Sequence, residues 1–175
     1  MVSFFYSITL VTQMDHEFSQ HGNETEFFEI DFSTTIARLV DVYDGDTITV
    51  VMKVFGNFYK FHVRLAGIDT CEMRSKCEWN RQHAIKARNR LFCLATGVEV
   101  DGSISIKSYL DTHVTFVELT KCGQDKYSRL LCRVRDVSGS IDFADILVEE
   151  RLAYQYKGDR KLTEDEQKSL LDVSP

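Results

Sequence analysis

The sequence predicts an α+β fold, a five-stranded Greek-key β-barrel of the OB-fold type with about three helices. Five short β-type runs lie between residues 36 and 137, and a helical run follows the third of them. With 175 residues, of which 43% are hydrophobic, the chain can build one full hydrophobic core. Closing short strands into a barrel would bury the apolar face of the sheet and leave no exposed edge.

The first three runs predict an antiparallel meander. They cover Ile36–Val42, Thr47–Phe55 and Tyr59–Ala66. An Asp-Gly-Asp turn at residues 44–46 separates the first two runs, and Asp-Gly between β-type runs is a hairpin signal. A Gly-Asn pair at residues 56–57 marks the second turn. The third run alternates apolar with polar residues, which indicates a strand with one buried face.

A long helix is expected after the meander. Gly67–Lys76 is irregular, but the apolar residues of Trp79–Ala95 have helical spacing, and Gly97 ends the pattern. Val98–Asp111 has no clear period, so either an additional hairpin or a long loop fits it.

Two more strands and two more helices are expected in the remainder. The strands cover Val114–Leu119 and Leu130–Val137. Ile141–Glu150 is amphipathic and predicts a helix. Thr163–Leu171 predicts the last helix, because its first residue is followed by Glu three positions later, as in a capping box.

Charge is unevenly distributed along the chain. The formal net charge is −6, but residues 1–35 carry six acidic and no basic residues, whereas residues 36–140 carry 16 basic and 12 acidic residues. We expect residues 1–35 to form an acidic N-terminal arm or extension, residues 36–158 the barrel domain, and residues 159–175 a C-terminal helix or tail. A polyanionic ligand is disfavoured for the two terminal parts and compatible with the middle one.

Residues 1–12 are apolar but lack a basic leading stretch, so we interpret them as a strand or amphipathic arm rather than a signal peptide. No run of about 18 apolar residues predicts a membrane-spanning helix, and no membrane partner is expected. The five cysteines include no CxxC pair and are typical of small apolar residues in a reduced protein, although Cys71 and Cys77 are close enough in sequence for a disulfide. These features favour an intracellular over a secreted protein.

Three polar clusters of the barrel region carry the functional signal. The first is Asp-Gly-Asp-Thr at residues 44–47, and the third is Asp-Lys-Tyr-Ser-Arg at residues 125–129. The second consists of Arg64 followed by Asp69, Thr70 and Glu72. Each alone is typical of a solvated turn or a charged surface, but their order and strand context together are specific.

In this combination the chain resembles the staphylococcal nuclease (thermonuclease) family over roughly Ile36–Tyr156. The resemblance implies a five-stranded barrel with three helices, a bound calcium ion and nuclease activity. It places the two calcium-ligating carboxylates on Asp46 and Asp69, and a ligating backbone carbonyl on Thr70. Calcium takes about 6–8 oxygen ligands, so such a set leaves positions for water and a phosphate oxygen.

The resemblance also implies three catalytic residues. The phosphate-binding arginines fall on Arg64 and Arg129, and the general-base candidate falls on Glu72. Each guanidinium can offer paired N–H donors to the charge that develops on a phosphoryl group. An electrostatic role for Glu72 fits the same spacing as a general base.

The remaining matched positions concern substrate binding. Lys126 and Tyr127 match positions that flank the nucleotide phosphate in the family. Two family tyrosines that contact the nucleotide correspond to Tyr154 and Tyr156, of which we assign Tyr156 to the substrate site. Packing against the barrel is the alternative role for both tyrosines, because the local alignment needs a gap.

The chain departs from the family pattern at three places. Cys71 replaces a frequent Pro, which puts the rigidity of that turn in question. Ser128 replaces a frequent Gly, and about ten additional residues fall near Val98–Asp111.

The resemblance predicts a calcium-dependent endonuclease with DNA, preferably single-stranded, and RNA as its partners and no small-molecule cofactor. It would leave 3′-phosphate ends. The alternative is a non-catalytic nuclease-like module that binds nucleic acid or protein. Retention of all six metal-binding and catalytic residue types favours the enzyme.

Overall fold

The computed structural model describes residues 18–172 except 27, 126 and 128. The apolar segment 1–12, for which an arm or strand was expected, lies outside the described residues. The chain divides into two units, Met1–Asp31 and Phe32–Pro175. Every helix and strand discussed below belongs to the second unit.

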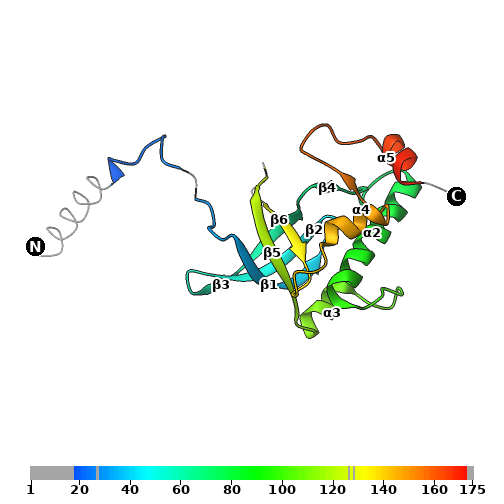
Figure 1. Ribbon diagram of the computed structural model, residues 1–175, viewed down its shortest axis with the longest axis horizontal. Coiled ribbons are helices and arrows are strands. Elements are labelled where there is room, and N and C mark those ends of the chain that lie inside the picture. The colour runs from blue at the N-terminus through cyan, green and yellow to red at the C-terminus, as the bar shows by residue number, and fades with distance from the viewer. Residues whose placement is uncertain (1–17, 27, 126, 128, 173–175) are drawn as a thin grey trace, which may run out of the picture. The chain divides into compact units, whose positions relative to one another are not determined.

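The predicted fold class is confirmed, because five strands close into a barrel in the order β1-β2-β3-β6-β5 (Figure 1). The strands are β1 (Thr34–Val42), β2 (Thr47–Val54), β3 (Asn57–Leu65), β5 (Thr115–Gln124) and β6 (Leu130–Arg135). β1, β2 and β3 form the expected antiparallel meander. β5 pairs antiparallel with both β1 and β6, and a parallel pairing of β3 with β6 closes the barrel.

The barrel interior is filled by aliphatic side chains from every strand. In β1, β5 and β6 they alternate with less buried residues, as a period of two requires. The buried set includes Leu39, Ile48, Val50, Val63, Leu65, Val117, Leu119, Leu130 and Val134. Burial of this apolar surface fixes the register of each strand and hence the positions of the turns at the barrel mouth.

Four α-helices pack around the barrel in the described part of the chain (Figure 1). They are α2 (Glu78–Thr96), α3 (Ile106–Thr112), α4 (Phe143–Glu149) and α5 (Glu164–Leu171). The long helix α2 buries a stripe that includes Ala84, Ala87 and Leu91, and it ends at Gly97 in the left-handed conformation with φ of 74°. None of the described helices is long and apolar enough to span a membrane.

The segment for which a hairpin or a loop was expected contains a helix instead. Its two apolar residues at helical spacing, Ile106 and Leu110, are both buried, and the Ser105 side chain caps the first turn. Two apolar residues are too few to establish a helical period, so the sequence pattern missed α3.

A second, two-stranded sheet was not predicted. β4 (Ile68–Asp69) lies in the segment expected to be irregular, and it pairs antiparallel with β7 (Tyr154–Gln155). This pairing places Asp69 opposite Tyr154, and it brings the C-terminal part of the chain beside the second polar cluster.

Candidate functional site

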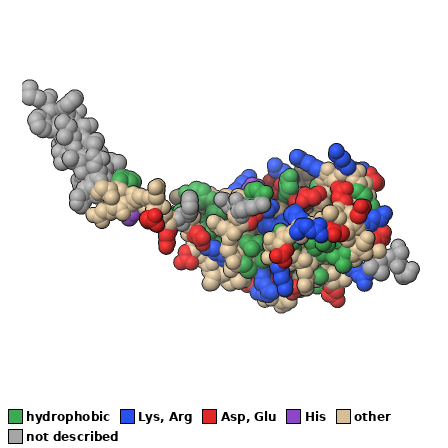
Figure 2. Space-filling view, turned by 90° about the horizontal axis from the view of Figure 1, so that it is seen from above, with side chains coloured by type: hydrophobic (Ala, Val, Ile, Leu, Met, Phe, Trp, Pro, Cys, Tyr) green, Lys and Arg blue, Asp and Glu red, His purple; other side chains and the backbone are tan. Residues whose placement is uncertain are grey.

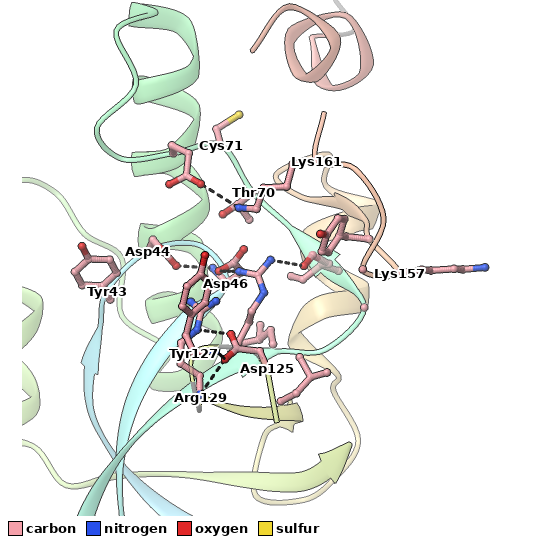
Figure 3. Close-up of a pocket in the computed structure, with 18 of the residues that line it drawn as sticks. Tyr43, Asp44, Asp46, Thr70, Cys71, Asp125, Tyr127, Arg129, Lys157 and Lys161 are labelled. Carbon is pink, nitrogen blue, oxygen red and sulfur yellow. Dashed lines mark hydrogen bonds and ion pairs between the residues drawn. The ribbon is translucent and has the colours of Figure 1, made fainter. Parts of the chain in front are cut away.

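A cavity of about 1140 Å³ opens where the three polar clusters meet (Figure 3). Seven of the nine predicted site residues line it: Asp46, Arg64, Thr70, Glu72, Tyr127, Arg129 and Tyr156. Asp69 does not line the cavity and is only 1% exposed. Lys126 lies outside the described residues.

Arg64 joins the first two clusters through its guanidinium group. Its Nη1 donates to Asp46 Oδ1 at 2.7 Å, and its Nη2 donates to Asp69 Oδ1 at 2.5 Å. Nη2 also donates to the Ile68 carbonyl at 3.1 Å. Arg64 lies near the end of β3 and is itself buried, so these bonds hold both carboxylates at a fixed separation.

Asp46 is buried in an environment that disfavours its ionised form. Burial, reinforced by the Asp44 carboxylate, raises the pKa of Asp46 to about 7, although the ion pair with Arg64 opposes that shift. Arg64 and the Thr47 hydroxyl both donate to Oδ1 of Asp46. Oδ2 takes no hydrogen bond from the described residues, so it remains able to ligate a cation.

The pKa of Asp69 is shifted in the opposite direction to that of Asp46. Burial disfavours its charged form, but hydrogen bonds from Tyr154 and Arg64 and the charge of Lys161 outweigh burial and lower the pKa of Asp69. The Tyr154 hydroxyl donates to Oδ2 at 2.5 Å. Lys161 Nζ lies 3.0 Å from Oδ1. Asp69 is therefore ionised at neutral pH and surrounded by donors.

Arg129 reaches the cavity from the turn between β5 and β6. Its Nε donates to Asp125 Oδ2 at 2.7 Å, and the backbone N–H groups of Tyr127 and Arg129 donate to Asp125 Oδ1. Its Nη1 lies 3.3 Å from the Thr47 hydroxyl, and its guanidinium lies 5.7 Å from the centre of the Tyr127 ring. Asp125 thus orients Arg129 toward the cavity (Figure 3), which Arg64 also lines.

The Asp-Gly-Asp turn packs tightly against the rest of the site. A Cβ atom added to Gly45 would lie 2.6 Å from the Cβ of Ala87 in α2 and 2.9 Å from the Cγ2 of Thr70. Only glycine fits without displacing these atoms, so the close contact holds Asp46 beside Thr70.

The two tyrosines near the C-terminus have different roles. Tyr154 is buried and packs with Cys71, with Ala84 of α2 and with Leu171 of α5, rather than against the barrel strands. Tyr156 lines the cavity, and its hydroxyl donates to the Asp159 carbonyl at 2.8 Å. Tyr156 is therefore the tyrosine available to a ligand.

The cysteines of the site are structural. Cys71 and Cys77 are both free thiols, so the disulfide considered for them is not formed. Cys71 is 1% exposed, and burial raises the pKa of its thiol to about 11. A protonated, buried thiol at this position is a packing residue rather than a nucleophile.

The residues predicted to hold calcium offer oxygen donors, which are the ligands that calcium prefers. Asp46 Oδ2 takes no hydrogen bond from the described residues, Asp69 is ionised, and Thr70 lines the cavity. Burial is the largest cause of the raised pKa of Asp46, and a cation bound there would favour the ionised carboxylate. Among the described residues, no three His, Cys, Asp or Glu side chains are grouped so that they could hold a metal ion together.

Two contacts of the site have no signal in the sequence motifs. Tyr154 and Lys161 contact Asp69 through the β4–β7 pairing and the segment that follows it, more than 80 positions away in the chain. A two-residue strand pairing has no periodicity, so sequence spacing could not reveal either contact.

No model of a known protein family matches the sequence, and no curated protein matches it significantly.

Proposed function

We propose that the chain is a calcium-dependent endonuclease of the staphylococcal nuclease type, which hydrolyses single-stranded DNA and RNA. The observation that supports this proposal is the arrangement of Arg64, Arg129 and Glu72 around one cavity, beside the carboxylates of Asp46 and Asp69. Those groups, drawn from three separated clusters, are the ones that phosphodiester hydrolysis requires.

Asp46, Asp69 and the Thr70 carbonyl would hold the calcium ion. When bound, the ion supplies positive charge beside the scissile phosphate. Arg64 and Arg129 donate N–H groups to the phosphoryl oxygens, on which negative charge increases in the transition state. Because Asp46, Asp69 and Asp125 already orient both guanidinium groups, little reorganisation is needed when the substrate binds.

In this proposal Glu72 accepts a proton from the attacking water. Its side chain is 67% exposed and lines the cavity, so water can reach it. The water oxygen bonds to phosphorus as one water proton passes to Glu72, the bond from phosphorus to O5′ breaks, and O5′ takes a proton from solvent water. Glu72 then releases its proton to solvent. The products are a 3′-phosphate and a 5′-hydroxyl. The aromatic rings of Tyr127 and Tyr156 at the cavity favour an unpaired strand, because they can stack on splayed bases.

The test is cleavage of denatured DNA by the full chain, with calcium and with a chelator, beside Glu72→Gln. We expect calcium-dependent cleavage that falls by about 10²-fold or more in Glu72→Gln, with little change in DNA affinity. Glu78→Gln is a matched control, because Glu78 is an exposed acid in the first turn of α2 outside the cavity. DNA binding without cleavage by the unmodified chain would instead identify a non-catalytic module.

A further inference from the structure

Lys161 covers the buried carboxylate of Asp69 on the cavity side. It lies on the segment between β7 and α5 and lines the cavity, whereas Asp69 does not. Its Nζ is 3.0 Å from Asp69 Oδ1 and 3.1 Å from Glu72 Oε1. Figure 3 shows the Lys161 side chain reaching inward, while Lys157 from the same segment extends away. One ammonium group thus joins a predicted metal ligand to the predicted general base.

The partners of Asp69 differ in how easily they can be replaced. Arg64 and Tyr154 are 8% and 5% exposed, and each donates to the carboxylate at 2.5 Å. The Lys161 side chain is 49% exposed and its contact is longer. An ion that enters from the cavity would therefore displace Lys161 and leave the two buried donors in place.

We propose that Lys161 is an internal counter-ion that competes with the divalent cation for Asp69 and Glu72, and so sets the calcium concentration that the site requires. This inference rests on the proposed function in one respect, namely that the cation is calcium. Without the cation, the ammonium group neutralises the two carboxylates. When the cation binds, the same charge becomes repulsive at close range, so Lys161 must move away.

Hydrogen bonds anchor the backbone next to Lys161, so the side chain is the part that moves. The N–H of Leu162 donates to the Tyr154 hydroxyl at 3.4 Å, and Gln167 of α5 donates to the Leu162 carbonyl at 3.1 Å. The next residue, Thr163, is the N-cap of α5. Four rotatable bonds allow the lysine head group to leave the carboxylates while this backbone stays fixed.

The first test measures calcium affinity by titration calorimetry on the full chain. We expect Lys161→Met to bind calcium about tenfold more tightly than the unmodified protein, because a competing positive charge is removed. Lys157→Met removes the same charge from a residue that lines the same cavity, and it should change the affinity less than about twofold. Lys161→Gln, which keeps a hydrogen-bond donor without the charge, should behave as Lys161→Met and serves if the methionine variant does not fold.

A second measurement follows thermal unfolding with a chelator and with calcium. Lys161→Met should unfold at a lower temperature than the unmodified protein in chelator, and calcium should raise its unfolding temperature by a larger increment. Equal or weaker calcium binding by the Lys161 variants would overturn the inference while leaving the nuclease proposal intact. Failure of the unmodified chain to bind calcium at all would overturn both.

Discussion

Arg64 and Arg129 stand in different environments although both point at one cavity. Arg64 is buried between two carboxylates, whereas Arg129 is partly exposed and pairs with Asp125 alone among the acidic residues described. Removing the hydrogen-bond donor of a buried carboxylate lowers the free energy of unfolding strongly, whereas removing the donor of a partly exposed carboxylate lowers it little. Only Arg64 therefore contributes to the fold as well as to the site.

We expect Arg64→Lys and Arg129→Lys each to lower cleavage by about 10²-fold or more, because lysine cannot offer paired donors. Arg64→Lys should also lower the free energy of unfolding by about 1–3 kcal/mol, since one of its two carboxylates loses its donor. Initial cleavage rates and urea unfolding curves measure the two effects. Equal stability of the two variants would contradict the structural role of Arg64.

Asp46 makes stability depend on pH in an unusual direction. A free aspartate has a pKa of about 3.9, whereas burial and Asp44 raise the pKa of Asp46 to about 7. Since the folded state holds the proton more tightly, the contribution of Asp46 to stability is complete below pH 4 and is lost as the pH rises through 7.

Asp46→Asn should therefore unfold at a higher temperature than the unmodified chain at pH 8 in the presence of a chelator. The advantage should shrink as the pH falls and vanish near pH 4, where the aspartate is protonated in both states. Thermal unfolding across this pH range measures the difference. A constant difference at every pH would mean that the side-chain charge is not its cause.

At the scale of elements, runs with a recognisable period or helix cap were predictable, whereas runs without either were not. The alternating run at Tyr59–Ala66 became β3, and Trp79–Ala95 became α2, each within two residues of the predicted bounds. Helix α3 and the β4–β7 pair have too few residues for a period, so tertiary contacts define them. The motifs similarly indicated Asp46, Arg64 and Arg129, but not the contacts of Tyr154 and Lys161.

The capping box predicted for the last helix is present and anchors the segment that carries Lys161. Thr163 accepts from the Glu166 N–H at 3.3 Å, and the Glu166 carboxylate accepts from the Thr163 N–H at 2.8 Å. We expect Thr163→Ala to lower the free energy of unfolding by about 1 kcal/mol in urea titrations. Ser169→Ala removes an exposed hydroxyl from the same helix without touching the cap, and it should have little effect. Equal effects would remove the capping explanation.

At the scale of the whole molecule, charge is the least typical property for a nucleic-acid enzyme. Figure 2 shows Lys and Arg side chains interspersed with Asp and Glu on the visible face, rather than a continuous basic surface. Residues 1–31 carry six acidic and no basic residues, so the remaining 144 positions hold 21 of each sign. The N-terminal unit thus supplies the entire formal net charge of −6.

Removing residues 1–31 should therefore strengthen binding of single-stranded DNA. The acidic unit repels a polyanion over distances of about one Debye length, roughly 10 Å at 0.1 M salt, so the gain should be several-fold at low salt and fade as salt increases. Fluorescence anisotropy in a Glu72→Gln background measures affinity while the DNA remains intact. A full-length variant in which the six acidic residues of segment 1–31 are replaced by their amides separates the effect of charge from that of chain length. If the amide variant binds as weakly as the unmodified sequence while the truncated chain binds tightly, the N-terminal unit hinders DNA by its bulk, and electrostatic repulsion is not the cause.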